Sequence, residues 1–121
     1  MLLRDFYTIN DIKQNDEIST VQVQLNPNHK VYEGHFPVEP VTPGVCTLQI
    51  IKECAGQILN GGYHYTQISS CKFLSVINPK LNNVLELQLK LSVTDEGIAV
   101  LADVFQKEQQ VLKLKANLQK A

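Results

Sequence analysis

The stretch Gly34-His35-Phe36-Pro37-Val38-Glu39-Pro40-Val41-Thr42-Pro43-Gly44-Val45 places one histidine among three prolines, directly before an apolar helical pattern. Each proline fixes its own φ and disfavours helix at the residue before it, so a stiff loop is predicted. Thr42 is expected to cap the helix, with Pro43 in the first helical position and Gly44 in the first turn. Because first-turn amides have no partner inside the helix, the Gly44 N–H is expected to be free to donate.

His35 and Gly44 are the two residues of this loop that suggest chemistry. An imidazole titrates near neutral pH and can act as a general base, and a first-turn amide lies at the positive end of the helix dipole. A base beside such a donor suits a reaction at a carbonyl group that develops negative charge. The alternative is structural: a histidine that packs or caps a tight loop, and a glycine that permits close packing.

An amphipathic helix is predicted from Val45 to about Leu59. Its apolar residues recur at the spacing of one buried face, which consists of Leu48, Ile51, Ala55, Ile58 and Leu59. Ile50 and Cys54 widen this face. Asn60-Gly61-Gly62 is expected to end the helix. A helix this apolar needs cover over much of its circumference, and we expect strands to supply it.

Alternating apolar and polar residues predict strands on both sides of this helix. The clear predicted strands are residues 20–25, 84–93, 98–106 and 110–118. Residues 7–9 are expected to start a further, short strand. Thr94-Asp95-Glu96-Gly97 is expected to form a hairpin turn. Strands, one helix and then a meander of about four strands indicate an α+β fold, with the helix packed on an antiparallel sheet.

Length and composition indicate a single domain over residues 1–121, with one core. A net charge of −1 and a pI near 6.3 argue against a general role on nucleic acid or a membrane surface. The sequence has no apolar run of membrane-spanning length and no signal-peptide core, so we expect a cytoplasmic protein. The three cysteines, Cys46, Cys54 and Cys71, lack metal-ligand spacing and are interpreted as packing residues.

The loop before the helix resembles the signature of the FabA/FabZ type of 3-hydroxyacyl-acyl-carrier-protein dehydratases. That signature reads roughly GHFPxxPxxPGxxxx followed by Glu or Asp, and positions 34 to 37, 40, 43 and 44 match it. The segment from Ile68 to Asn83 also looks like the strand and turn that follow the helix in this family, through Lys72, Phe73 and Pro79. The resemblance therefore covers the loop, the helix and the strand after it.

The resemblance implies a hot-dog fold, in which an antiparallel sheet wraps a long central helix, and a homodimer or heterodimer. It implies loss of water from a 3-hydroxyacyl thioester on acyl carrier protein, giving a trans-2-enoyl thioester for fatty-acid or polyene-type lipid biosynthesis. His35 would be the base and Gly44 the donor to the enolate-like oxygen. No metal or other cofactor is implied.

Gln49 departs from the family pattern. It stands fourteen residues after His35, where the family carries its catalytic Glu or Asp. An amide cannot protonate a departing hydroxide, although it can hydrogen-bond the hydroxyl group or hold a water molecule. If nothing replaces the acid, we expect a rate loss of about 10²–10⁴-fold.

Glu53 is the first candidate to replace the missing acid. Residues four apart share a helix face, so Glu53 should point roughly where Gln49 points, but about 5.4 Å further along the axis. The alternative is a solvated polar stripe that Gln49 and Glu53 form with Lys52 and Gln57. Glu33 and Glu39 on the loop rank below Glu53 as acids, and a partner chain could also supply a carboxylate.

The remaining expected contacts follow from the same resemblance. We expect Phe36, Val45 and Phe73 to contact the acyl chain. Acyl carrier protein is acidic, and Lys72, Lys80 and Lys30 are candidates to dock it. An ordinary solvated surface explains these lysines equally well.

The sequence leaves two other functions open. The chain could be a catalytically degenerate subunit that binds an acyl thioester within a heteromeric dehydratase. It could also be a thioesterase of the hot-dog fold, although such enzymes typically rely on a carboxylate.

Overall fold

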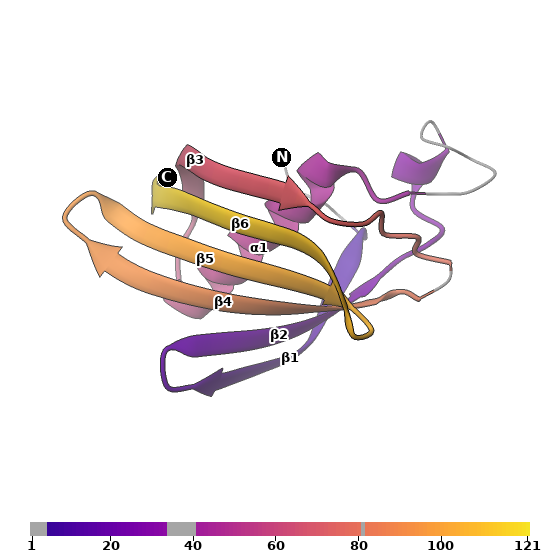
Figure 1. Cartoon of the computed structure of the whole chain (residues 1–121), viewed down its shortest axis with the longest axis horizontal. Helices are drawn as coiled ribbons and strands as arrows, with labels where there is room; N and C mark the ends of the chain where they lie inside the picture. The colour runs from indigo at the N-terminus through magenta and orange to yellow at the C-terminus, as the bar shows by residue number, and fades with distance from the viewer. Residues whose placement is uncertain (1–4, 34–40, 81) are drawn as a thin grey trace.

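The computed structural model describes residues 5–33, 41–80 and 82–121. Six strands and one long helix make up most of it (Figure 1). In chain order the elements are β1 (Tyr7–Asn15), β2 (Ile18–Leu25), the short 3-10 helix η1 (Lys30–Tyr32), α1 (Gly44–Leu59), β3 (Tyr63–Phe73), β4 (Val84–Thr94), β5 (Gly97–Gln106) and β6 (Gln109–Lys120).

All six strands form one antiparallel sheet in the order β1-β2-β4-β5-β6-β3. Three hairpins join β1 to β2, β4 to β5 and β5 to β6. After β2 the chain runs through α1 and then β3, which pairs with β6 at the far edge, before it returns to β4 beside β2 (Figure 1). The prediction of a four-strand meander after the helix was therefore wrong for β3, because alternation within a strand does not reveal its partner.

The core lies between the inner face of the sheet and α1, which runs behind the sheet in Figure 1. The strict alternation predicted for 84–93 places Leu85, Leu87 and Leu89 in this core. It does not hold to the end of the strand, where Leu91 is only partly buried and Val93 is 82% exposed because β4 runs past the helix. Fully buried residues of β4, β2 and β6 include Leu85, Leu87, Leu89, Val21, Val23, Leu112 and Leu118. The helix contributes Cys46, Ile50, Ile51, Cys54 and Ala55. One-sided burial of this kind is typical of a helix on an antiparallel sheet.

The helix begins one residue later than its capping residues suggest. Pro43, with φ −60° and ψ 141°, is the N-cap, and the helix starts at Gly44. Thr42 does not cap it, because its hydroxyl is hydrogen-bonded to the hydroxyl of Tyr32 at 2.9 Å. The predicted C-terminus is confirmed: Asn60 adopts the left-handed conformation there, and its N–H donates to the carbonyl of Gly56.

Two further expectations need correction. β1 extends to Asn15, whereas only 7–9 was recognised, because a mostly exposed edge strand carries little apolar alternation. Leu48, Ile58 and Leu59 are only partly buried, although they were predicted on the buried face of the helix. The sheet therefore covers less of the helix than its apolar character suggests, and one flank of α1 is left accessible.

This arrangement, one central helix held against a curved six-stranded antiparallel sheet, is the hot-dog fold. The predicted fold class is thus confirmed. Within residues 5–33, 41–80 and 82–121, α1 is the only long helix, and at 16 residues it does not reach the length and apolar character that crossing a bilayer requires.

The turn between β4 and β5 depends on a glycine. Gly97 has φ +130°, a conformation that residues with a Cβ rarely adopt, and an added Cβ would collide with the carbonyl oxygen of Leu118. The predicted turn at Thr94–Gly97 is confirmed here, and its geometry explains the glycine.

Gly97→Ala is expected to lower the free energy of unfolding by about 1–3 kcal/mol, because the strained φ and the collision both oppose the native hairpin. Gly62→Ala is the matched control, since an added Cβ there meets nothing within 4 Å. Urea denaturation of both variants measures the difference. Equal stability of the two would contradict this account of the turn.

Candidate functional site

Three of the predicted loop residues, His35, Phe36 and Glu39, lie outside the described residues. Their roles therefore remain predictions from the sequence. Glu33, the other loop carboxylate, is described: it is exposed and follows the 3-10 helix η1. The structure brings Glu33 to neither of the two hollows described below.

The first hollow lies at the start of α1 and has a volume of about 390 Å³. Gly44, Val45 and Phe73, to which the resemblance assigned contacts with the thioester, line it together, with Val76, Val111 and Leu112 among the other residues of its wall. Phe73 is 56% exposed and Val45 68% exposed, so both present apolar surface at this place. A mostly apolar lining with few polar groups is typical of a small-molecule site.

The backbone of Gly44 is available in this wall. Within the part of the chain that the structure describes, the Gly44 N–H has no hydrogen-bond acceptor. The turn is held by neighbours, because the amides of Cys46 and Thr47 donate to the Pro43 carbonyl and that of Thr42 donates to the Ile77 carbonyl. The amide of Gly44 thus fits a donor at the positive end of the helix.

The ring of Phe73 rests on Gly44. A Cβ built on Gly44 would lie 2.7 Å from Cζ and 2.8 Å from Cε1 of that ring. The missing side chain at position 44 therefore lets strand β3 bring an aromatic ring onto the helix start, which closes one side of the hollow.

The second hollow, about 560 Å³, lies along the exposed flank of α1. Gln49, Lys52, Glu53, Gln57 and Tyr63 line it with the residues that end the helix, Asn60 to Gly62. Gln49 and Glu53 point the same way, as predicted from their spacing: Nε2 of Gln49 donates to Oε2 of Glu53 at 2.7 Å. They are partly buried and hydrogen-bonded, so a merely solvated stripe does not describe them.

Tyr7, at the start of β1, completes this cluster and was missed by sequence reasoning. Its hydroxyl donates to Oε1 of Glu53 at 2.7 Å, across 46 positions of the sequence. Burial, and then the bond to Glu53, raises the pKa of Tyr7 well above its ordinary value, so the phenol stays protonated and keeps donating. No local pattern around Tyr7 reveals a partner so distant in the chain.

The two hollows are separate within one chain. Gly44, Val45 and Phe73 line one, whereas Gln49 and Glu53 line the other. The first hollow therefore brings the predicted backbone donor together with the predicted acyl contacts. The second brings together Gln49, at the position where the family carries its acid, and Glu53, the candidate to replace that acid. Neither hollow alone contains the complete set of predicted residues.

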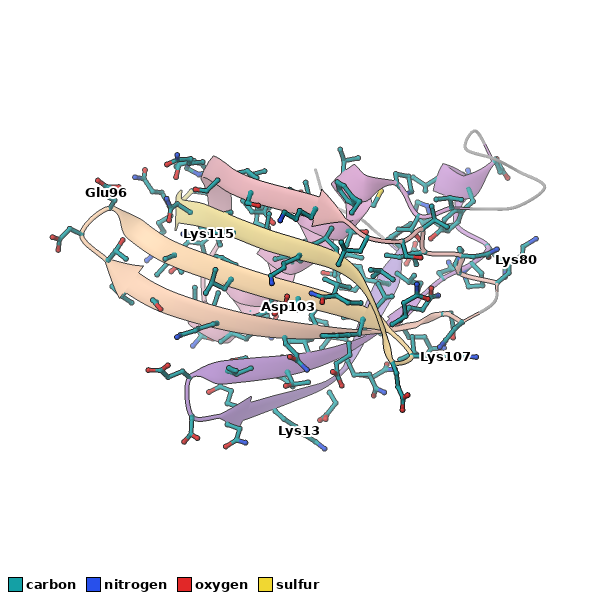
Figure 2. The ribbon with its side chains drawn as sticks, viewed as in Figure 1. Lys13, Lys80, Glu96, Asp103, Lys107 and Lys115 are labelled. Atoms are coloured by element: carbon teal, nitrogen blue, oxygen red, sulfur yellow. The ribbon has the colours of Figure 1, made fainter. Side chains whose placement is uncertain are left out.

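The docking candidates Lys72, Lys80 and Lys30 are all exposed. Lys72 lies directly opposite Lys113 across the β3–β6 pair, and the sheet face turned away from α1 also carries Lys115 and Asp103 (Figure 2). Lys80 lies in the loop before β4, at the end of the molecule where Figure 2 also shows Lys107. The lysines are thus spread over two regions rather than gathered around one opening.

The cysteines behave as packing residues. Cys46 and Cys54 are 2% and 0% exposed, and burial raises the pKa of Cys54 to about 12. Burial also raises the pKa of Cys71, which is only partly buried. All three thiols are thereby disfavoured as nucleophiles, in line with the interpretation from the sequence.

Gly44→Ala is expected to lower the free energy of unfolding by about 1 kcal/mol more in the native chain than in a Phe73→Ala background. The new Cβ must displace the phenyl ring only when that ring is present. Urea denaturation of the two single variants and the double variant measures this coupling. An identical effect of Gly44→Ala in both backgrounds would show that the ring does not press on the helix start.

Alkylation by iodoacetamide at pH 8 should modify Cys71 first, with Cys46 and Cys54 reacting only after unfolding. With a pKa near 12, only about one Cys54 thiol in 10⁴ is ionised at that pH, and none of its surface is accessible. Peptide mass spectrometry against time gives the order. Early modification of Cys54 in folded protein would contradict the described packing.

Comparison with known proteins agrees with this fold. The pattern of the ApeI-like family, described as ApeI dehydratase, matches residues 11–115. The 3-hydroxyacyl-acyl-carrier-protein dehydratase FabZ of Aeromonas salmonicida is 26% identical over 91 residues, which is 66% of this chain and 60% of that protein. FabZ of Shewanella woodyi is 28% identical over 82 residues, 60% of this chain and 53% of that protein. The chain thus spans little more than half the length of these curated relatives.

Two solved structures share the architecture over almost the whole chain. The dehydratase heterocomplex ApeI:P from Xenorhabdus doucetiae matches with a TM-score of 0.74 and 24% identity, covering 93% of this chain and 97% of that one. An uncharacterized protein from Erwinia carotovora subsp. atroseptica matches with a TM-score of 0.66 and 25% identity, covering 93% of each chain. Since the family pattern spans most of the sequence, this chain belongs to the ApeI-like dehydratase family of hot-dog proteins.

Proposed function

We propose that this chain dehydrates 3-hydroxyacyl thioesters carried on acyl carrier protein to trans-2-enoyl thioesters. The observation that carries the proposal is the Gly44 amide, a backbone donor without a described partner in the wall of an apolar hollow at the start of α1. Membership of a dehydratase family supports the reaction class. The hollow offers the donor and the apolar surface that an acyl thioester requires.

In the proposed reaction, His35 removes the proton from the carbon beside the thioester carbonyl. The Gly44 N–H stabilises the negative charge that develops on the carbonyl oxygen. The bond from the third carbon to its hydroxyl oxygen then breaks, the carbon–carbon double bond forms, and the hydroxyl leaves as water after taking up a proton. Val45, Phe73 and Phe36 contact the acyl chain, and no cofactor takes part.

The proton for the leaving hydroxyl is proposed to come from the imidazolium that the first step creates at His35. Gln49 cannot supply it, because an amide does not ionise in this range. Both oxygens of Glu53 accept hydrogen bonds, so its described contacts support a positioning role more than that of an acid. Lys72 and Lys80 remain proposed contacts for the acidic carrier.

A second candidate is a subunit that binds the acyl thioester within a heteromeric dehydratase. Gln49 favours it, since the residue at the expected acid position cannot donate a proton to hydroxide. The separation of the two hollows within one chain favours it too, because neither brings the predicted residues of a full site together and a partner chain could supply what is lacking. The similar Xenorhabdus structure is described as a dehydratase heterocomplex.

Incubation of the purified chain with 3-hydroxyacyl carrier protein should yield the enoyl product, followed by mass spectrometry. His35→Ala is expected to lower the rate about 10²–10⁴-fold, the usual cost of losing a general base. Gln49→Glu is expected to raise it, because a second carboxyl group beside Glu53 favours the protonated form of one of the pair. Lys13→Ala, on β1 and in the wall of neither hollow, serves as the control variant.

The same assay separates the two candidates. Turnover by the chain alone supports the enzyme, whereas turnover that begins only when a second hot-dog chain is added supports the binding subunit. Release of free fatty acid and carrier thiol would indicate a thioesterase and contradict both.

A further inference from the structure

Thr47 is a buried polar residue of α1 that the proposed reaction does not use. It is 1% exposed and lines the apolar hollow at the start of the helix, as Gly44 does. The usual partner of a helical threonine hydroxyl is the carbonyl four residues earlier. Here that carbonyl belongs to Pro43, and it already accepts the amides of Cys46 and Thr47 at 3.0 and 3.3 Å. Within residues 5–33, 41–80 and 82–121, the Thr47 hydroxyl makes no hydrogen bond.

The hydroxyl oxygen is the atom of the Thr47 side chain that reaches the hollow. In the described part of the chain, every fully buried side-chain oxygen or nitrogen has a hydrogen-bond partner. The Thr47 oxygen has none there, so it must keep a small accessible surface, and the open space that Thr47 lines is this hollow. A polar atom in apolar surroundings is costly unless a hydrogen bond satisfies it. The position therefore favours a ligand atom that pairs with a hydroxyl group.

Thr47 and Gly44 present their donors at the same end of the hollow. Residues three apart lie on one face of a helix, and helical side chains lean toward the N-terminus, over the turn before them. The Thr47 side chain therefore covers the turn that begins at Gly44, whose N–H has no described acceptor. The other hydroxyl groups of this wall differ: Thr42 is bonded to Tyr32, and Ser75 lies in the loop after β3.

We propose that the Thr47 hydroxyl is a second donor to the carbonyl oxygen of the acyl thioester, beside the Gly44 amide. The inference rests on the proposed function and adds a catalytic residue to it. As the proton leaves the carbon beside the carbonyl, negative charge develops on the oxygen, and two donors at the positive end of the helix stabilise it better than one. The hydroxyl keeps its own proton throughout, so this contact adds no proton transfer to the reaction.

Infrared spectroscopy of a bound ligand tests the contact directly. The probe is octanoyl-pantetheine thioester with a ¹³C-labelled carbonyl group, which has no hydroxyl group to lose and stays intact on a dehydratase. Binding to the native full chain should lower the carbonyl stretching frequency, because hydrogen bonds weaken the C=O bond. Thr47→Val should bind the probe with a smaller shift, and Thr47→Ser, which keeps the hydroxyl group, should retain the native shift.

Kinetics with 3-hydroxyacyl carrier protein give a second measurement, on the chain alone or with whichever partner chain turnover requires. Thr47→Val is expected to lower kcat about 10²-fold with little change in KM, the lower end of what the loss of one oxyanion donor costs. Thr47→Ser should keep most of the rate. Thr66→Val makes the same chemical change on β3, in the wall of neither hollow, and should keep the native rate.

Urea denaturation shows whether the hydroxyl group has a structural partner instead. Valine has the shape of threonine without the unpaired hydroxyl group, so Thr47→Val should unfold at an equal or higher urea concentration than the native chain. A clearly lower midpoint would show that the hydroxyl group is bonded within the protein and would overturn the proposal.

The outcomes separate the second donor from the proposed function. An unchanged carbonyl shift or an unchanged kcat in Thr47→Val would overturn the role of Thr47 while the proposed function stands. Binding of the probe by the native chain without any shift would overturn both donors. Failure of the native chain to bind the labelled thioester would overturn the proposed function, and the second donor with it.

Discussion

The burial of one face of α1 against the sheet is the constraint on which the described sites depend. Ile50, Ile51, Cys54 and Ala55 are fully enclosed between helix and sheet, so the helix can neither rotate nor slide without exposing them. This packing fixes the position of Gly44 at the N-terminal end of α1 and the direction in which Gln49 and Glu53 point from its accessible flank. The incomplete cover of α1 then becomes useful, since an entirely enclosed helix would offer no surface to a ligand.

On the accessible flank of α1, the order of Gln49 and Glu53 along the helix decides which of them can donate a proton. An acid followed one turn later by an amide would place a proton donor at position 49, whereas here the amide comes first and the carboxylate supports it. With a tyrosine on its other oxygen, that carboxylate is committed to accepting hydrogen bonds. The same types of side chain, in reverse order, thus leave at position 49 an amide that the carboxylate one turn later holds in place.

Much of this architecture could be predicted from local patterns. The end of the helix at Asn60, the strand β4 and the turn before Gly97 depend on residues close in sequence, and all three were confirmed. The place of β3 beside β6 could not be predicted, because it depends on which strand edge is left unpaired once the hairpins have formed. Tyr7 was missed for the same reason: its bond to Glu53 exists only after β1 and α1 meet in the fold.

The pairing of β3 with β6 sets Lys72 and Lys113 face to face on exposed surface. Two ammonium groups at such a position repel each other, and dissolved ions weaken the repulsion. On its other side Lys113 lies opposite Asp103 of β5, whose carboxylate attracts it, so dissolved ions weaken a repulsion and an attraction together. The cohesion of this edge therefore rests on the backbone hydrogen bonds between β3 and β6 and on the apolar residues of β6 that face the core.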